Sequence, residues 1–220
     1  MKKFLPILLF AAAITQQSNA QSVELKAGVS VSDWRGDGLA ALNSLVGLTG
    51  NYINRQPYIG YYGGATVKIP VSDQLSVEPG LLYSQTGSSL RGELGIKGID
   101  ILNINAQANM IQQSIEIPLM IKAKMGGGFE VMAGPQASYQ LKNKLQVNAS
   151  ALGFNLLNKS YDLDGIFEPF NVSAMAGFQY TLPNGLGIQA VYEHGLTSMI
   201  KDRSAKVYAQ SGRVGVSYRF

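Results

Sequence analysis

The sequence contains no cysteine, and charged residues make up only 15% of its 220 residues. Without cysteine the chain can form neither a disulfide nor a thiolate metal site. A bacterial lipoprotein is also excluded, because its lipid is carried by a cysteine that follows the signal. The low content of charge lies below the roughly 25% that is usual in soluble domains.

Long apolar runs are missing as well. No stretch of 18 apolar residues follows residue 20, so we expect no membrane helix. A membrane form of this chain must therefore be a closed barrel. Basic residues are scattered, and the net charge of +4 includes Lys2 and Lys3 of the N-terminus. This charge distribution predicts no nucleic-acid partner.

His194 is the single histidine of the chain. A metal site would need carboxylates for its remaining ligands, and Ser198 is the nearest candidate nucleophile. We therefore predict no metal, no cofactor and no catalytic residue, and we do not expect an enzyme.

The first 20 residues have the organisation of a secretory signal. Lys2 and Lys3 precede an apolar run from Phe4 to Ile14, and small residues end at Ala20. The run is too short to cross a bilayer as a helix. We predict a signal peptide over residues 1–20, cleavage between Ala20 and Gln21, and a single exported domain over residues 21–220.

Eight segments of that domain alternate apolar and polar residues, which is typical of strands with two different faces. Each has about the length that a tilted strand needs to cross a bilayer. The predicted strands are Ser22–Ser32, Tyr58–Ile69, Leu75–Gln85, Gln113–Met125, Phe129–Gln140, Phe170–Tyr180, Leu186–His194 and Gly212–Phe220.

The connections between these segments alternate between short and long. Short turns are predicted at Val71–Gln74, Gly126–Gly128 and Leu182–Gly185, and long connections at Asp33–Pro57, Thr86–Gln112, Lys142–Glu168 and Gly195–Tyr208. Outer-membrane barrels have an even number of strands, short periplasmic turns and long extracellular loops. The sequence therefore predicts an all-β fold, an eight-stranded antiparallel up-and-down transmembrane β-barrel in the outer membrane.

Parts of the long connections have structure of their own. Leu39–Leu48 could form a short helix over the barrel mouth, while Gly95–Ile104 and Val147–Leu157 alternate as strands that continue above the membrane. Pro79, Pro118 and Pro135 fall within predicted strands. Each must lose a ladder hydrogen bond or mark a bulge, and the sequence leaves both open.

In a membrane barrel of this size the polar face fills the lumen, and charges there can pair. The predicted network consists of Glu24, Lys26, Lys68, Glu78, Glu116, Lys122, Lys124, Glu130, Glu193, Arg213 and Arg219. We expect it to plug the lumen. A narrow ion or proton path is the alternative interpretation.

Aromatic residues gather near both ends of the predicted strands, as in the girdles of membrane barrels. One band holds Phe129, Tyr180, Tyr218 and Phe220, and the other holds Tyr61, Tyr83, Tyr139, Phe170 and Tyr192. The last strand ends on alternating Val216, Tyr218 and Phe220. We interpret these three as a C-terminal signal for the barrel-assembly machinery.

Several stretches resemble the PorT-like outer-membrane β-barrel family of the Bacteroidetes. They are Val77–Gly87, Ile115–Lys122, Val131–Pro135, Ala176–Gly177, Ala190–Leu196 and Tyr218–Phe220. The resemblance spans nearly the whole mature chain and implies an eight-stranded barrel in the outer membrane. It implies no catalytic residue.

Three functions agree with these observations. The first is a non-enzymatic structural or binding protein, in contact with outer-membrane lipid, that reaches an envelope protein partner through its extracellular loops. The second is a PorT-like component of a protein secretion or assembly complex. The third is a soluble exported barrel that binds a ligand, with its apolar face inside.

Overall fold

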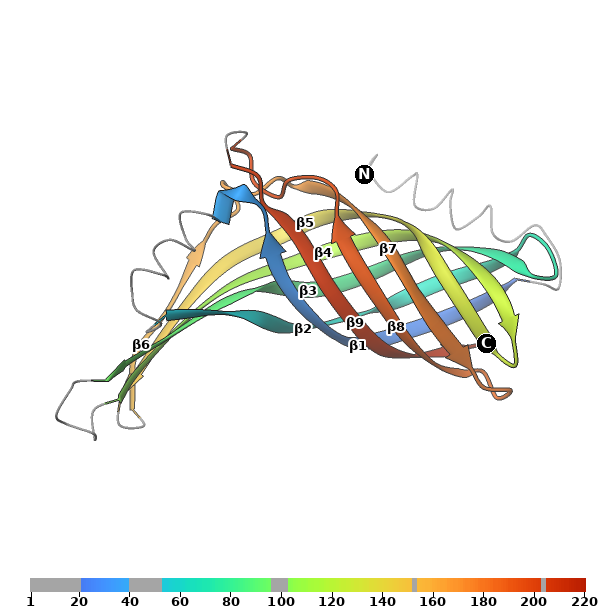
Figure 1. The fold of residues 1–220 in the computed structure, drawn as a ribbon, viewed down its shortest axis with the longest axis horizontal. Coiled ribbons are helices and arrows are strands. Elements are labelled where there is room, and N and C mark those ends of the chain that lie inside the picture. The colour runs from blue at the N-terminus through green and yellow to red at the C-terminus, as the bar shows by residue number, and fades with distance from the viewer. Residues whose placement is uncertain (1–20, 40–52, 96–102, 152–153, 203–204) are drawn as a thin grey trace, which may run out of the picture.

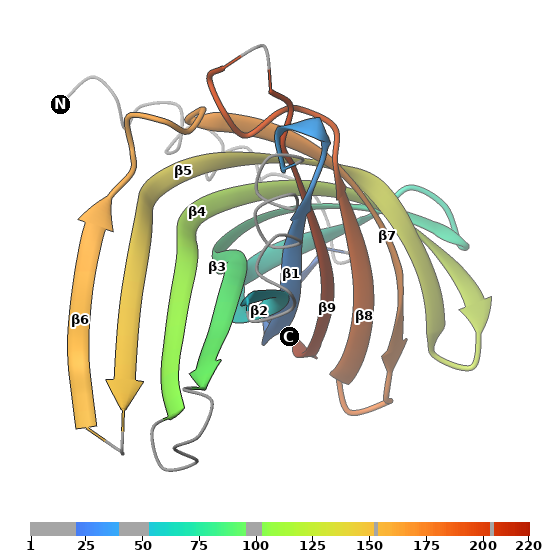
Figure 2. The same ribbon diagram turned by 60° about the vertical axis from the view of Figure 1, so that its left-hand side comes forward.

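The computed structural model describes residues 21–39, 53–95, 103–151, 154–202 and 205–220. Figure 1 shows its strands, and Figure 2 shows them turned by 60°. The described elements are β1 (Ser22–Arg35), η2 (Asp37–Leu39), β2 (Ile53–Pro70), β3 (Leu75–Gly95), β4 (Asn103–Gly126), β5 (Phe129–Ala151), β6 (Phe154–Asp162), β7 (Phe170–Thr181), β8 (Leu186–Gly195) and β9 (Tyr208–Arg219). Within these residues, no helix combines the length and the apolar character that a membrane crossing requires.

Eight of the strands form a closed ring. The order β4-β3-β2-β1-β9-β8-β7-β5 is completed by pairing of β4 with β5, and β6 lies outside the ring beside β5. Neighbouring strands are antiparallel throughout. The first and last strands close the barrel, where the Phe220 N–H donates to the Val23 carbonyl over 3.0 Å. The predicted fold class is therefore confirmed.

The predicted short turns are all present and define one end of the barrel, the turn end. Three consecutive glycines, Gly126 to Gly128, have φ values of 100°, 60° and 85°. L-residues rarely adopt such values, so glycine permits this tight reversal between β4 and β5. The opposite end is called the loop end.

The alternation places the apolar residues on the outside of the barrel. Val29 on β1 is 54% exposed and Ile117 on β4 is 55% exposed, whereas Glu24 and Glu78 are fully buried inside. An outer wall of this kind suits acyl chains rather than water. The alternative of a soluble exported barrel, which requires an apolar interior, is therefore wrong.

The three prolines predicted within strands, Pro79, Pro118 and Pro135, interrupt the ladder without shifting its register, whereas a register shift follows Pro57 of β2. The β3–β4 pairs stop at Pro79↔Leu119 and resume at Leu82↔Glu116 in the same register. The β4–β5 pairs show the same gap between Pro118↔Gln136 and Ile121↔Ala133. Pro118 thus costs ladder hydrogen bonds and marks no bulge.

The strands around β4 run much further than predicted at the loop end. β3 continues to Gly95, β4 begins at Asn103, and β5 continues to Ala151, where β6 pairs with it. Within the described residues, Thr86–Gln112 and Lys142–Glu168 are therefore mostly strand, as the alternation of Val147–Leu157 indicated, whereas most of the strand predicted over Gly95–Ile104 lies outside the described residues. Of the helix predicted over Leu39–Leu48, only Leu39 lies within the described residues, at the end of η2.

This continuation forms a curved sheet beyond the ring (Figure 2). We call it the sheet extension and define it as residues 53–57 of β2, 86–95 of β3, 103–112 of β4, 143–151 of β5 and all of β6. Its start is marked by the row Gln85↔Gln113↔Lys142 across β3, β4 and β5.

Candidate functional site in the barrel lumen

The lumen is filled from the turn end by a cluster of paired charges. This turn-end cluster consists of Glu24, Lys26, Lys68, Glu78, Lys122, Glu130 and Arg219, contributed by β1, β2, β3, β4, β5 and β9. Lys26 and Lys122 both contact Glu78, the latter at 2.5 Å, and Lys122 also lies 3.7 Å from Glu24. A buried charge is tolerated when it is paired in this way.

The same cluster is closed towards the turn end. Arg219 lies 3.4 Å from Glu24 and 3.4 Å from Glu130, which also pairs with Lys68. Gln179 of β7 connects the network across the lumen, because its amide donates to Glu24 over 2.5 Å and accepts from Lys122 over 2.8 Å. These bonds tie strands that are far apart in the ring.

An apolar layer follows towards the loop end. Met120, Met132, Met175 and Val191 form a buried cluster on β4, β5, β7 and β8. The space between Lys26 of the turn-end cluster and Arg213 is lined by these residues with Tyr62 and Leu82. Since methionine fills irregular gaps, the layer separates two charged regions by a mainly apolar zone, in which Gln189 donates to the Tyr62 hydroxyl.

A second cluster, the loop-end cluster, lies beyond this layer and is centred on Arg213 of β9. Its guanidinium donates to both oxygens of Glu116, over 2.6 and 2.9 Å, and also to Glu193. Such a bidentate arrangement matches the fork of arginine to a carboxylate. The Arg213 guanidinium also lies 5.6 Å from the centre of the Tyr62 ring.

Hydroxyl and amide groups complete the bonding of the two carboxylates. Glu193 accepts from Ser173 and Ser211, each over 2.9 Å, and from Gln136 over 3.1 Å. Ser84 donates to Glu116. The loop-end cluster thus joins two carboxylates to one guanidinium, whereas the turn-end cluster joins three carboxylates to four cations.

Lys124 was predicted to belong to the lumen charge network, but it lies outside both clusters. It is exposed at the turn end of β4, next to the irregularity between Lys124 and Gly126 in the pairing with β5. It lines an open hollow with Arg219 and Phe220. The parity of the strand assigned it to the lumen, but the strand ends there and leaves the side chain in solvent.

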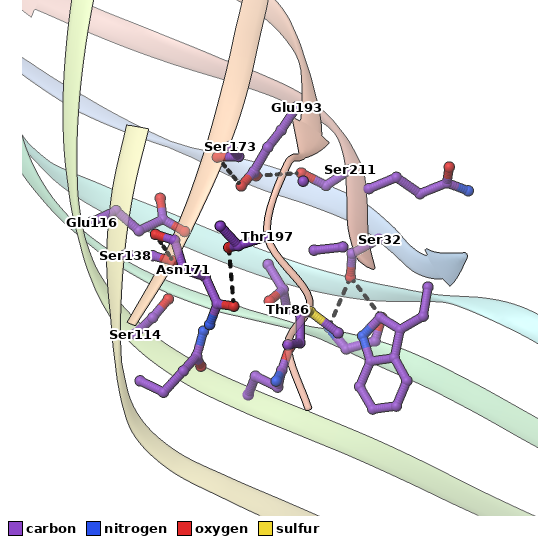
Figure 3. A pocket seen from close by; sticks show the side chains of 18 of the residues that line it. Ser32, Thr86, Ser114, Glu116, Ser138, Asn171, Ser173, Glu193, Thr197 and Ser211 are labelled. Atoms are coloured by element: carbon purple, nitrogen blue, oxygen red, sulfur yellow. Dashed lines mark hydrogen bonds between the residues drawn. The ribbon is translucent and has the colours of Figure 1, made fainter. Parts of the chain in front are cut away.

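A polar chamber lies between the loop-end cluster and the barrel mouth, and Figure 3 shows its walls. Hydroxyl and amide groups from β1, β3, β4, β5, β7 and β9 line it, together with Glu116 and Glu193. Its cavity volume is about 30 Å³. That is close to the volume of one water molecule in the liquid, and far below the 300–1,000 Å³ of ordinary ligand pockets.

A small apolar cap covers the chamber. Trp34, Leu39, Phe167, Met199 and Val207 pack together there and are all buried. The Trp34 and Phe167 rings meet edge to face at 5.6 Å. The interior is therefore a sequence of charged, apolar, charged, polar and apolar layers.

His194 lies near the loop end, half-buried, and its ring contacts Arg35 and Tyr192. The Arg35 guanidinium is 2.7 Å from Nε2, and the Tyr192 hydroxyl is 3.3 Å from Nδ1. Ser198 instead donates to the Ile200 carbonyl and accepts from the Val207 N–H. Among the described residues, no three His, Cys, Asp or Glu side chains are grouped as metal ligands.

The outer wall carries the predicted aromatic bands. Near the turn end, Phe129 stacks on Phe178 at 5.9 Å, and Tyr218 meets Phe220 at 4.9 Å. Val216, Tyr218 and Phe220 are all exposed on this wall. At the other band, Tyr61 lies 6.3 Å from Tyr83.

The apolar layer and the chamber were not found from the sequence. Met120, Met132, Met175 and Val191 have the parity of the lumen face, but they are apolar on a face expected to be polar. The sequence signal for the layer was the presence of these apolar residues at positions that face the lumen. Only the ring of strands shows that these four meet at one level.

Residues 15–201 match the family described as "Outer membrane protein beta-barrel domain". The chain belongs to this family, and it is a small β-barrel protein of the outer membrane. None of the curated protein sequences matches it.

Several solved outer-membrane barrels are similar to the chain in shape. Ail of Yersinia pestis, solved with the heparin analogue sucrose octasulfate, is 12% identical with a TM-score of 0.45, and the match covers 91% of this chain and 99% of Ail. Neisserial surface protein A is 10% identical with a TM-score of 0.46, covering 92% and 100%. OprG of Pseudomonas aeruginosa is 14% identical with a TM-score of 0.37, covering 93% and 98%. These values are too low to support an argument about this chain.

Proposed function

We propose that the protein is a closed, non-enzymatic barrel that holds the sheet extension outside the cell for a structural or binding role. The observation that carries this proposal is the filled lumen, in which Arg213 and Lys122 lie on either side of the methionine layer. An eight-stranded barrel is just wide enough for side chains to fill. A packed, mainly apolar layer between two fixed charge clusters opposes the passage of ions.

Conductance across a planar bilayer tests the closed lumen. We expect the purified protein to insert and to show no single-channel steps. A double variant, Met132→Ala with Met175→Ala, widens the apolar layer and serves as the matched comparison. Stable steps from the unaltered protein would refute the closed lumen and favour the narrow ion path.

The orientation is part of the proposal. A signal peptide over residues 1–20, cleaved between Ala20 and Gln21, would deliver the chain from the periplasm, so that the turn end faces the periplasm. Single-cysteine variants test this, because the natural chain has no cysteine. An impermeant thiol reagent should label Asn158→Cys on intact cells and leave Asn184→Cys unlabelled. The reverse result would show that the barrel has the opposite orientation in the membrane. N-terminal sequencing should begin at Gln21.

The absence of enzymatic activity rests on the surroundings of His194. Its ring nitrogens face Arg35 and Tyr192, and Ser198 bonds to other groups. A nucleophile and its base must lie within hydrogen-bonding reach. His194→Ala should leave every cellular phenotype of the protein intact. Complete loss of a phenotype would favour the hypothesis that the protein is an enzyme.

Assembly is proposed to depend on Val216, Tyr218 and Phe220 at the C-terminus. These side chains lie on the outer wall of the closing strand, where the barrel-assembly machinery can read them. Deletion of Phe220 should reduce the compact, heat-modifiable band in membranes, while Phe178→Leu on β7 should not. An unchanged band after the deletion would show that Phe220 is not needed for barrel assembly.

A component of a secretion or assembly complex, as in the PorT-like family, is the second candidate. It is favoured by β6, which pairs with β5 on one side and is an edge of the sheet within the described residues. Edge strands are templates for pairing with another chain. A photo-crosslinker at Ser160 should give one defined adduct with an envelope protein in intact cells, and one at Asn184 should give none.

A further inference from the structure

The sheet extension has one strongly polar face. A first row on this face runs across five strands as Gln56↔Ser89↔Asn109↔Gln146↔Ser160. A second row, further from the membrane, runs as Asn54↔Arg91↔Gln107↔Asn148↔Asn158. Nine of these ten side chains end in a carboxamide or a hydroxyl, and Arg91 alone is charged.

The direction of these rows is fixed by the strand β4. Its odd-numbered residues include Ile115, Ile117 and Leu119, which are exposed on the outer wall of the barrel. Asn109 and Gln107 have the same parity, and the β3–β4 pairing keeps one register over this region. The polar rows therefore continue the lipid-facing wall upwards.

The opposite face of the extension is covered within the molecule. Leu90, Ala108, Met110 and Leu145 line one space with Trp34 and Leu39 of the cap. Met110 also packs against the cap cluster. The amide-bearing face is thus the side that points away from the barrel axis.

The centre of the polar face is already ordered by its own hydrogen bonds. Ser89 donates to the Asn109 amide oxygen over 2.7 Å, and Gln107 donates to the same oxygen over 3.0 Å. Carboxamides and hydroxyls each offer donors and acceptors. A surface held in this way loses little conformational freedom when it binds a ligand.

The height of this face above the apolar belt indicates which ligand it meets. The exposed apolar residues of β4 end before the row Gln85↔Gln113↔Lys142, and Ile111, which is buried, is the last apolar residue of that parity before the two polar rows. Gln107 lies six residues beyond Gln113, which corresponds to roughly 20 Å along a strand. In an outer membrane, the molecules beside that stretch of wall are the saccharide headgroups of the outer-leaflet glycolipid, whose hydroxyls both donate and accept hydrogen bonds.

We propose that the two polar rows bind the saccharide headgroup of that glycolipid, continuing the contact that the barrel wall makes with its acyl chains. A protein partner on this face is disfavoured, because interface centres are enriched in aromatic residues and methionine, and these rows contain neither. The proposal rests on the proposed function in one respect, that the extension stands on the outer side of the membrane.

The test measures glycolipid binding to the full, folded protein in detergent by native mass spectrometry. Two probes are used: a lipopolysaccharide with a complete core oligosaccharide, and a deep-rough form that carries lipid A with only its innermost sugars. The unaltered protein should bind the first more tightly, about tenfold, as expected for a few additional hydrogen bonds. Free core oligosaccharide should bind far more weakly, since it lacks the acyl chains.

The variant Gln146→Ala with Asn148→Ala removes one amide from each row on β5. It should lose the preference for the complete core and keep its affinity for the deep-rough form. The control, Gln74→Ala with Asn184→Ala, removes two amides at the turn end and should keep the preference. A heat-modifiable band shows that each variant is folded.

Equal binding of both glycolipids by the unaltered protein would overturn the inference, as would an unchanged preference in the Gln146→Ala, Asn148→Ala variant. Tight binding of free oligosaccharide would also overturn it, in favour of a soluble glycan. Failure of the proposed orientation is seen separately, as protection of Asn158→Cys from the impermeant reagent on intact cells.

Discussion

The same three strands carry opposite chemistry on the two sides of the row Gln85↔Gln113↔Lys142. On the barrel side of this row, the outer face is apolar and the inner face is charged, as Ile117 and Glu116 of β4 illustrate. On the extension side, the outer face bears amides such as Gln107, and the inner face bears apolar residues such as Met110.

The alternation of side chains between the two faces is the same in both regions, but the environment of each face differs between them. Inside the belt, the outer side meets acyl chains and the inner side must pair its charges. Beyond the belt, the outer side carries amides and hydroxyls, and the inner side packs on the cap around Trp34. A strand that crosses from one region into the other has to reverse its polarity.

The largest effect is expected from removal of the central cation. Arg213→Ala leaves Glu116 and Glu193 buried without their partner, and should lower the free energy of unfolding by about 3–5 kcal/mol. Arg91→Ala, on the exposed face of the extension, should change it by less than about 0.5 kcal/mol. Urea unfolding in lipid vesicles, followed on gels and by Trp34 fluorescence, measures both; equal effects would contradict the contrast.

A charge placed on the outer face tests the comparison within one strand. Ile117→Arg puts a cation in the acyl region and should cost about 2–4 kcal/mol if the position lies near the midplane. Gln107→Arg has the same parity on β4 and should cost about zero, because its surroundings are polar. Similar unfolding curves for the two variants would show that one environment covers the whole strand.

The inner face of the extension gives a smaller effect. Leu145→Asn puts an amide into the space that Leu145 shares with Trp34, and should destabilise the extension by about 1–3 kcal/mol. The neighbouring change Gln146→Asn, on the outer face, should do nothing measurable. Limited proteolysis and the emission maximum of Trp34 report on this region, and a red shift with the Gln146 variant alone would reverse the assignment of faces.

The smallest effect is expected at Lys124. Lys124→Ala removes an exposed cation and should change the stability by less than about 0.5 kcal/mol. Lys122→Ala, two residues away on the same strand, removes a fully buried partner of Glu78 and Glu24. Should Lys124→Ala be as damaging as Lys122→Ala, the side chain would belong to the lumen after all.

The barrel was predictable because alternation and turn chemistry act locally. The eight strands, their short turns and the parity of residues such as Glu24 and Arg213 follow from period two alone. The pairing of specific charges, for example Arg213 with Glu116, depends on which inward side chains meet across the lumen at the same level, and the sequence does not display that level. The continuous run of β3, β4 and β5 into the extension was predicted only in part, because the apolar residues of β4 change face beyond Ile111. Ala108 and Met110 continue the alternation with the apolar residues on the other face, so a search for one continuous apolar face stops there.

The measurement that tests the central claim most directly is the depth profile of the outer face of β4. The chain has no cysteine, so single replacements at Leu119, Ile117, Ile115, Gln113, Asn109 and Gln107 can each carry one nitroxide label. In bilayers, collision with oxygen should dominate at 119, 117 and 115, and collision with a water-soluble nickel complex should dominate at 113, 109 and 107. A profile in which 109 and 107 behave like 117 would contradict the account.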